Sequence, residues 1–271
     1  MTTTSPTTPT AATRSDSSRT LLADIEVMVL RSIRHTLRTP DALITALLLP
    51  VMITLAFTYL FGGALDMATD EVYLDYLVPG VLVLCIGFVA GGTAVSVYSD
   101  LDSGVIDRFR SLPTASITVL VGHVTASLLR TVLASTLVLG VAVAAGFRPS
   151  ASPGEWLTAL AIIVLYTLTI SWIATAVGLL VRSVDAANAF TTMLIFLPYL
   201  SSAFVPPETM PSTLQSIAEN QPLTPIIESL RELLTAREGH AHVLPAIAWL
   251  VPLMIGAVTA TPWLYRRRTK E

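Results

Sequence analysis

The sequence contains very little lysine, cysteine or charge. Its only lysine is Lys270, next to the last residue. A P-loop needs a lysine within G-x-x-x-x-G-K-[ST] to reach nucleotide phosphates, so this chain has none. Cys85 is the only cysteine, which excludes an intramolecular disulfide and argues against a metal site. The net charge of −3 is typical of a protein with no nucleic-acid partner.

The low charge indicates a protein that lies in a membrane. Charged residues make up 13% of the 271 residues and hydrophobic residues 53%, whereas soluble domains carry about 25% charge. Such a chain cannot cover its surface with polar groups in water. We therefore expect an all-α integral membrane protein in the bilayer.

Long apolar runs predict six transmembrane helices. A helix needs roughly 20 apolar residues to cross the hydrocarbon core, and uninterrupted runs of this kind exclude a β-barrel. Thr39 and Pro40 are typical of a helix start before the first run, and Pro198 lies near the end of the short fifth run. The predicted spans are 42–61, 76–98, 117–145, 156–181, 186–203 and 243–265.

The flanks of these spans predict the domain limits and the orientation. Residues 1–20 are rich in Thr, Ser and Pro and predict a disordered tail. The membrane domain is expected at 21–268, followed by a cytoplasmic end at 269–271. Arginines before the first span, between spans two and three, between spans four and five, and at the C-terminus all fall on one side of six crossings. Both termini are therefore expected in the cytoplasm.

Two amphipathic helices are expected on this cytoplasmic side. Before the first span, Ile25 and Val29 belong to an apolar stripe, with Arg34 and Arg38 largely off it. This pattern favours a helix in the membrane interface over an extension of the first span. Between spans two and three, one helical face is apolar and consists of Leu101, Val105, Phe109 and Leu112. Asp100 and Asp102 lie near the start of this predicted helix, and Arg108 and Arg110 lie near its end. By its pattern alone, this second helix could equally float on the lipid headgroups.

The third predicted span carries ionisable residues. His123, Ser127 and Arg130 share one face, and charged groups inside a membrane are candidates for function. They are candidates for a substrate path or a subunit contact, while a structural arginine bonded to helix carbonyls is the alternative. Gly87, Gly91 and Gly92 in the second span predict close helix packing.

A proline-rich segment follows the fifth span. Pro206, Pro211 and Pro222 divide the residues from Phe204 to Arg237 into short pieces. Short re-entrant helices fit this pattern if protein surrounds their backbone. An ordinary outer loop with amphipathic helices is the alternative.

Three of these segments resemble ABC type-2 transporter permeases, in particular the daunorubicin-resistance-type branch. The acidic, glycine-containing stretch 102–108 followed by Leu112-Pro113 is similar to the family's segment between spans two and three, although Asp102 stands where the family often has Glu. The stretches 200–211 and 217–231 resemble its outer re-entrant region, and 145–149 its third-span end. The resemblance extends from Leu21 to Arg268.

This resemblance implies a permease subunit of an ATP-driven exporter in a bacterial plasma membrane. The helix after span two would be the coupling helix that contacts a P-loop ATPase through Asp102, Gly104, Val105, Asp107, Arg108, Phe109 and Leu112. The helix with Ile25, Val29, Arg34 and Arg38 would be the interface helix. The chain itself would need no cofactor, since ATP and Mg would bind the partner ATPase. A second permease, identical or a paralogue, would complete the assembly.

The substrate and the mechanism class stay open at this level. A lipophilic or amphipathic substrate, such as a drug-like metabolite or a lipid, is expected from the branch, with lipid-linked polysaccharide as the alternative. An ion-coupled transporter or channel that uses His123 and Arg130 is a second class. An intramembrane enzyme built on His123 and Ser127 is disfavoured, because that span carries no acidic orienting residue.

Overall fold

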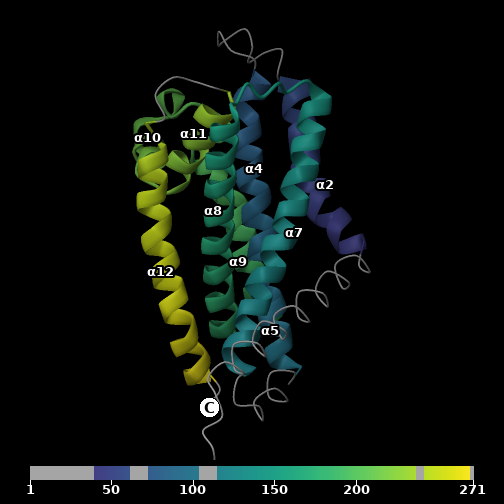
Figure 1. The fold of residues 1–271 in the computed structure, drawn as a ribbon, viewed down its shortest axis with the longest axis vertical. Helices are drawn as coiled ribbons and strands as arrows, with labels where there is room; N and C mark the ends of the chain where they lie inside the picture. The colour runs from purple at the N-terminus through teal and green to yellow at the C-terminus, as the bar shows by residue number, and fades with distance from the viewer. Residues whose placement is uncertain (1–39, 62–72, 104–114, 236–240, 269–271) are drawn as a thin grey trace, which may run out of the picture.

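A computed structural model describes residues 40–61, 73–103, 115–235 and 241–268. Every element in these ranges is helical, and the long helices lie side by side along the long axis of the molecule (Figure 1). The elements are α2 (Pro40–Ala56), a π-helix η1 (Phe57–Phe61), α4 (Tyr73–Gly91), α5 (Thr93–Asp102), α7 (Ala115–Ala145), α8 (Pro153–Leu180), α9 (Val184–Phe196), the 3₁₀-helices η2 (Leu197–Leu200) and η3 (Pro207–Thr209), α10 (Ser212–Glu219), α11 (Leu223–Leu234) and α12 (Val243–Arg268).

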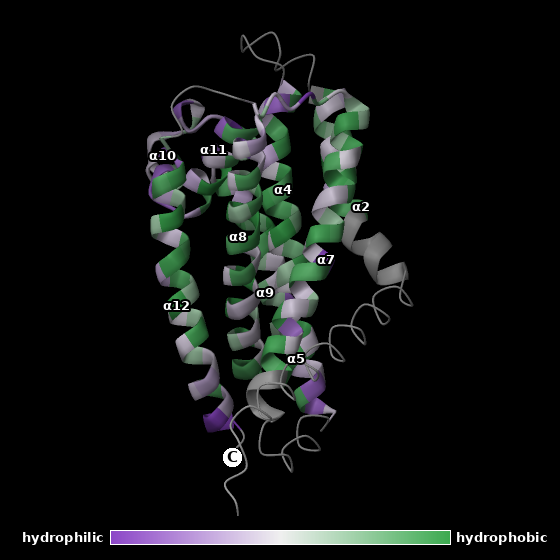
Figure 2. Cartoon of the chain, viewed as in Figure 1, coloured by the Kyte–Doolittle hydropathy of each residue, from purple (hydrophilic) through white to green (hydrophobic). Residues whose placement is uncertain are grey.

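Four helices of the described chain are long and apolar enough to cross a bilayer. They cover Tyr73–Asp102, Val119–Ala145, Pro153–Leu180 and Val243–Arg268, where spans two, three, four and six were predicted. The first and fifth predicted spans correspond to the shorter apolar helices Leu48–Leu60 and Val184–Leu200. Figure 2 shows hydrophobic residues along these helices and hydrophilic residues at the lower ends of α5 and α12.

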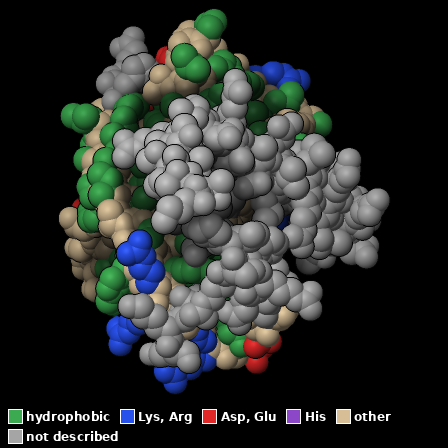
Figure 3. Space-filling view, turned by 60° about the horizontal axis from the view of Figure 1, so that its bottom comes forward, with side chains coloured by type: hydrophobic (Ala, Val, Ile, Leu, Met, Phe, Trp, Pro, Cys, Tyr) green, Lys and Arg blue, Asp and Glu red, His purple; other side chains and the backbone are tan. Residues whose placement is uncertain are grey.

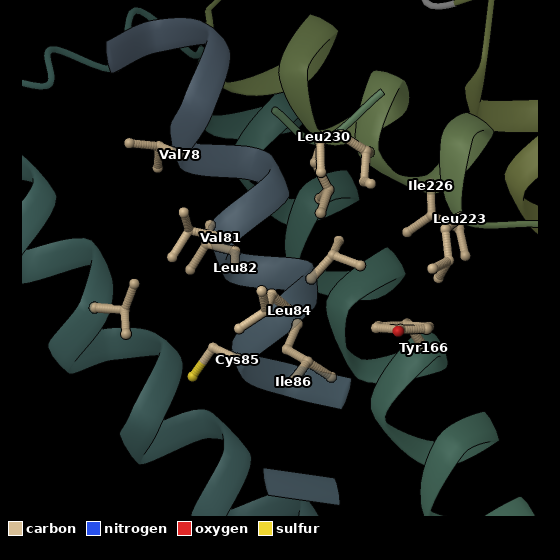
Figure 4. Close-up of a cluster of buried hydrophobic side chains, with 14 of the residues drawn as sticks. Val78, Val81, Leu82, Leu84, Cys85, Ile86, Tyr166, Leu223, Ile226 and Leu230 are labelled. Carbon is tan, nitrogen blue, oxygen red and sulfur yellow. The ribbon is translucent and has the colours of Figure 1, made fainter. Parts of the chain in front are cut away.

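The core forms around α4. This helix packs against α2, α7, α8, α9 and α11, and nearly all of its residues are buried. Leu77, Val81 and Leu84 are fully inaccessible to solvent, as is Cys85. Figure 4 shows side chains of α4 pointing outward in several directions: Ile86 lies on the side of Tyr166 of α8, whereas Val81 and Cys85 point to the opposite side. Since neighbouring helices surround α4, its sequence is apolar on every face.

Small residues allow close contacts between helices. A β-carbon at Gly91 would lie 2.8 Å from Leu194 Cδ1 of α9, so the close packing predicted for this glycine is confirmed. The contact at Gly178 is tighter still, because a β-carbon there would lie 2.6 Å from the carbonyl oxygen of Ala94. Through Gly178, the backbone of α5 rests directly on α8.

Helix starts follow the sequence signals closely. Ser152 caps α8: its hydroxyl accepts a hydrogen bond from the Glu155 amide, and the Glu155 carboxylate accepts one from the Ser152 amide at 2.6 Å. Ser183 caps α9 in a similar way by accepting from the Ala186 amide at 3.1 Å. The Ser183 cap follows directly after Arg182, in the short turn between α8 and α9.

The segment from Pro206 to Leu234 forms three short helices, and a proline precedes each one. Pro206 is the residue before η3, Pro211 the residue before α10, and Pro222 the residue before α11. Proline lacks an amide hydrogen and has a fixed φ, so it is well suited to the start of a helix. All residues of α11 are buried except Glu228. This helix therefore lies within the protein, against α4, α8 and α12.

Candidate functional site

The end of α5 and the start of α7 are joined by a polar contact. His123 Nε2 of α7 lies 3.0 Å from Asp100 Oδ2 of α5. Two residues before Asp100, the Tyr98 hydroxyl donates to the carbonyl oxygen of Arg182 at 3.0 Å. The contacts connect α5 with α7 and with the turn between α8 and α9. They lie directly before residues 104–114, on which most of the proposed coupling segment falls.

The structure corrects the predicted start of the coupling helix. Asp100 and Asp102 were expected near the beginning of a separate helix, but they occupy the last turn of α5, which ends at Asp102. α4 and α5 together form one apolar stretch, Tyr73–Asp102, which runs beyond residue 98, the predicted end of the second span. Asp102 is exposed, and its carboxylate accepts a hydrogen bond from Tyr98 at 3.5 Å. The other residues predicted for the coupling helix lie outside the described residues: Gly104, Val105, Asp107, Arg108, Phe109 and Leu112. The same is true of the residues predicted for the interface helix: Ile25, Val29, Arg34 and Arg38.

The polar face of α7 is turned toward the protein. Ser127 is fully buried and accepts a hydrogen bond from the Ser171 hydroxyl of α8 at 2.8 Å. Arg130 is half-buried, and within the described part of the chain no acceptor binds its guanidinium. His123 and Ser127 thus contact different partners, since the imidazole binds Asp100 and the serine binds Ser171.

Further hydroxyls continue this face toward the other end of α7. Thr131 and Ser135 follow Ser127 at intervals of four residues, and both are buried. Among the described residues neither hydroxyl has a hydrogen-bond partner. A buried polar group without a partner costs free energy, so such groups are candidates for contact with water or a ligand. Ser127, Thr131 and Ser135 therefore form a buried polar stripe on α7.

A second buried polar cluster, which was not predicted from the sequence, surrounds Arg231 of α11. The guanidinium donates to the carbonyl oxygen of Tyr76 at 3.2 and 3.0 Å and to that of Ser202 at 2.8 Å. It also forms an ion pair with Glu228. Its central carbon lies 3.6 Å from the centre of the Tyr76 ring, a cation–π contact. These contacts hold α11 against α4 and against the segment that follows α9.

One signal in the sequence could have revealed this cluster. Ile227, Arg231 and Leu234 fall at i, i+4 and i+7, so the arginine interrupts an apolar helical face. An arginine in that position needs buried acceptors, and Glu228 at i−3 supplies one of them. The carbonyl acceptors could not have been identified, because Tyr76 is 155 residues away in the sequence.

Phe204 lies next to this cluster. It is buried, its ring stacks on Tyr199 with centroids 4.6 Å apart, and its carbonyl oxygen accepts from the Tyr73 hydroxyl at 3.0 Å. Pro206 is half-buried, Pro211 is exposed and Pro222 is half-buried. The four residues singled out in this segment thus lie around the short helices η3, α10 and α11, at the end of the molecule opposite to Asp100 (Figure 1).

The fold and these clusters define a multi-pass membrane protein made of helices. A family of known proteins matches it: the ABC-2 type transporter family covers residues 23–235. The chain therefore belongs to the ABC-2 type transporter family.

Two similar permeases extend the comparison from the family to individual proteins. The chain is 33% identical over 233 residues to the "Daunorubicin resistance ABC transporter permease protein DrrB1" of Streptomyces coeruleorubidus. The matched residues make up 84% of this chain and 81% of that protein. The chain is 21% identical over 254 residues to the "Probable doxorubicin resistance ABC transporter permease protein DrrC" of Mycobacterium tuberculosis, 93% of this chain and 91% of that protein. The family resemblance read from the sequence is thereby confirmed.

Proposed function

We propose that this chain is the membrane-spanning permease subunit of an ABC exporter that moves a lipophilic or amphipathic drug-like molecule out of the cytoplasm. The observation that carries the proposal is the 33% identity, over most of both chains, to a permease named for daunorubicin resistance. A planar, amphipathic anthracycline is therefore the substrate class to test first. A separate P-loop ATPase would supply the energy.

The proposed arrangement has six crossings with both termini in the cytoplasm. The two shorter apolar helices, Leu48–Leu60 and Val184–Leu200, would complete the four long ones. Asp100, Asp102 and Arg182 would then lie at the cytoplasmic end, and α10 and α11 at the outer end. α11 would act as a re-entrant helix, which is compatible with its burial because its backbone is surrounded by protein.

The contact between His123 and Asp100 supports a route for coupling. In this proposal the ATPase binds the segment that follows Asp102, together with the interface helix. A push on that segment would reach α7 through the Asp100–His123 contact and α8 through the Tyr98–Arg182 hydrogen bond. The polar stripe on α7 would line part of the substrate path or the seam with a second permease. Arg130 would lie at the side of that stripe.

The test compares efflux with ATPase turnover. Cells that express the chain with its ATPase should accumulate less doxorubicin than cells that express either subunit alone. Asp107→Asn should lower efflux several-fold while the purified complex still hydrolyses ATP, because the carboxylate would lie in the coupling contact. Asp185→Asn, an exposed carboxylate in the first turn of α9, is the matched control and should retain efflux. Normal efflux by Asp107→Asn would contradict the coupling role.

A further inference from the structure

A basic groove lies between the end of α8 and the end of α12. It has a volume of about 260 Å³ and is lined by Leu179, Leu180, Arg182, Leu264, Arg267 and Arg268. Beside the groove, the Arg268 guanidinium donates to the Val181 carbonyl oxygen at 3.4 Å and so links the last turn of α12 to the end of α8. Figure 3 shows basic side chains gathered at this end of the molecule.

The groove carries three arginines and, within the described residues, no acidic side chain lines it. Arg182 and Arg267 are exposed, and neither guanidinium forms an ion pair with a carboxylate of the described chain. Most of their hydrogen-bond donors are therefore available to a ligand. Guanidinium groups bind phosphate oxygens in pairs, so the charge and the donors fit an anionic phosphate group.

The other walls of the groove are apolar. Leu180 is 58% exposed and Leu264 is half-buried. Trp263 does not line the groove but lies beside it: it is 59% exposed and lies under Arg267, whose central carbon is 5.6 Å from the ring centre. Exposed leucine and tryptophan beside arginines at the end of a spanning helix fit a molecule with a charged head and an acyl chain. A free phosphate ion would make no use of these side chains.

We propose that this groove binds the phosphate of an anionic phospholipid, with Arg182, Arg267 and Arg268 around the headgroup and Leu180, Leu264 and Trp263 along the acyl chain. The site is separate from the polar stripe on α7. A lipid bound there would join α8 to α12 at the membrane surface.

Native mass spectrometry of the purified chain tests the site. In detergent, phosphatidylglycerol should bind in preference to phosphatidylcholine, whose headgroup has no net charge. Arg182→Gln with Arg267→Gln should weaken phosphatidylglycerol binding by about 25-fold, because each arginine near a lipid surface contributes roughly a five-fold factor. Each single variant should lose about five-fold, which keeps the test valid if the double variant does not fold. Lysine at both positions should restore only part of the affinity, because it returns the charge but not the paired donors.

Arg266→Gln is the matched control. Arg266 precedes Arg267 and is also exposed, but it does not line the groove. Its replacement removes the same charge and should leave phosphatidylglycerol binding nearly unchanged. Equal losses in Arg266→Gln and Arg267→Gln would overturn the site, since they would reflect net charge alone. Equal binding of phosphatidylcholine would overturn it as well. Displacement of the lipid by millimolar inorganic phosphate would assign the groove to a soluble anion and overturn the lipid proposal.

Discussion

Arg231 is the largest fully buried side chain in the described part of the chain. A buried guanidinium is tolerated only where acceptors surround it, and here two carbonyl oxygens and one carboxylate do so. The three groups come from α4, from the segment after α9 and from α11 itself. A single residue therefore fixes the position of the short helix α11 relative to the spanning helices.

Replacing Arg231 by alanine should destabilise the protein strongly. The Glu228 carboxylate and the Tyr76 and Ser202 carbonyl oxygens would lose the guanidinium donors, although the Ser202 oxygen would keep its hydrogen bond from the Tyr76 hydroxyl. Removing one partner of a buried ion pair costs about 3 to 5 kcal/mol. Arg231→Lys should recover only part of this, because one ammonium group cannot reproduce the fork of donors. Thermal unfolding of the purified protein measures the effect.

Arg148→Ala is the control for this prediction. Arg148 is exposed and also donates to two carbonyl oxygens, those of Val143 and Phe147. Because water can replace an exposed donor, the control should cost less than about 1 kcal/mol. Similar losses of stability in both variants would contradict the structural role of the buried arginine.

At the scale of the helices, the contact at Gly178 sets how closely α5 and α8 can pack. A side chain there would meet the Ala94 carbonyl oxygen and the Val97 side chain of α5, at 2.6 and 2.9 Å. Backbone atoms cannot move aside as a flexible side chain can. The two helices would have to separate, and α5 carries Asp100 and Asp102 at its end.

Gly178→Ala should therefore destabilise the protein by about 1 to 3 kcal/mol, the usual cost of overpacking a tight contact. Gly140→Ala in α7 is the matched substitution, because a β-carbon at Gly140 would meet nothing within 4 Å. Alanine favours a helix over glycine by up to about 1 kcal/mol, so this variant should be neutral or slightly more stable. Thermal unfolding of both variants in the same detergent provides the measurement. A neutral Gly178→Ala would show that α5 does not rest on α8.

At this scale the sequence predicted the helices well and their mutual contacts poorly. Long apolar runs mark the spanning helices because lipid imposes a minimum length, and the ends of α7, α8 and α12 fall within a few residues of the expected positions. Local motifs also indicated the short helices after Pro206, Pro211 and Pro222. The burial of α11, the Gly178 contact and the Arg231 cluster depend on residues far apart in the chain, and a local pattern does not contain them.

The molecule as a whole has two chemically different ends. One carries Asp100, Asp102 and Arg182 together with the arginines at the end of α12, and the hydrogen bonds from Tyr98 and Arg268 show that these groups lie near one another. The other end holds Ser150, whose amide donates to the Leu234 carbonyl oxygen of α11 at 3.1 Å. By the positive-inside rule, we propose that the first end, which is rich in arginine, faces the cytoplasm.

Cysteine labelling tests this orientation. Cys85 is fully buried, so a background with Cys85→Ala should retain the fold and lack reactive thiols. Asp102→Cys should react with a membrane-impermeant maleimide only in inside-out vesicles, whereas Ser150→Cys should react in intact cells; both positions are exposed. Reaction of Asp102→Cys in intact cells would invert the proposed arrangement.

The central claim is that a partner ATPase powers transport. Doxorubicin uptake by inside-out vesicles tests this claim most directly. Vesicles from cells that express the chain with its ATPase should take up doxorubicin when ATP is added, and a proton uncoupler should not reduce this uptake. Neither a non-hydrolysable ATP analogue nor an ATPase variant without its P-loop lysine should support uptake. Uptake that needs no nucleotide and stops with the uncoupler would contradict the account, because the chain would then transport by ion coupling alone.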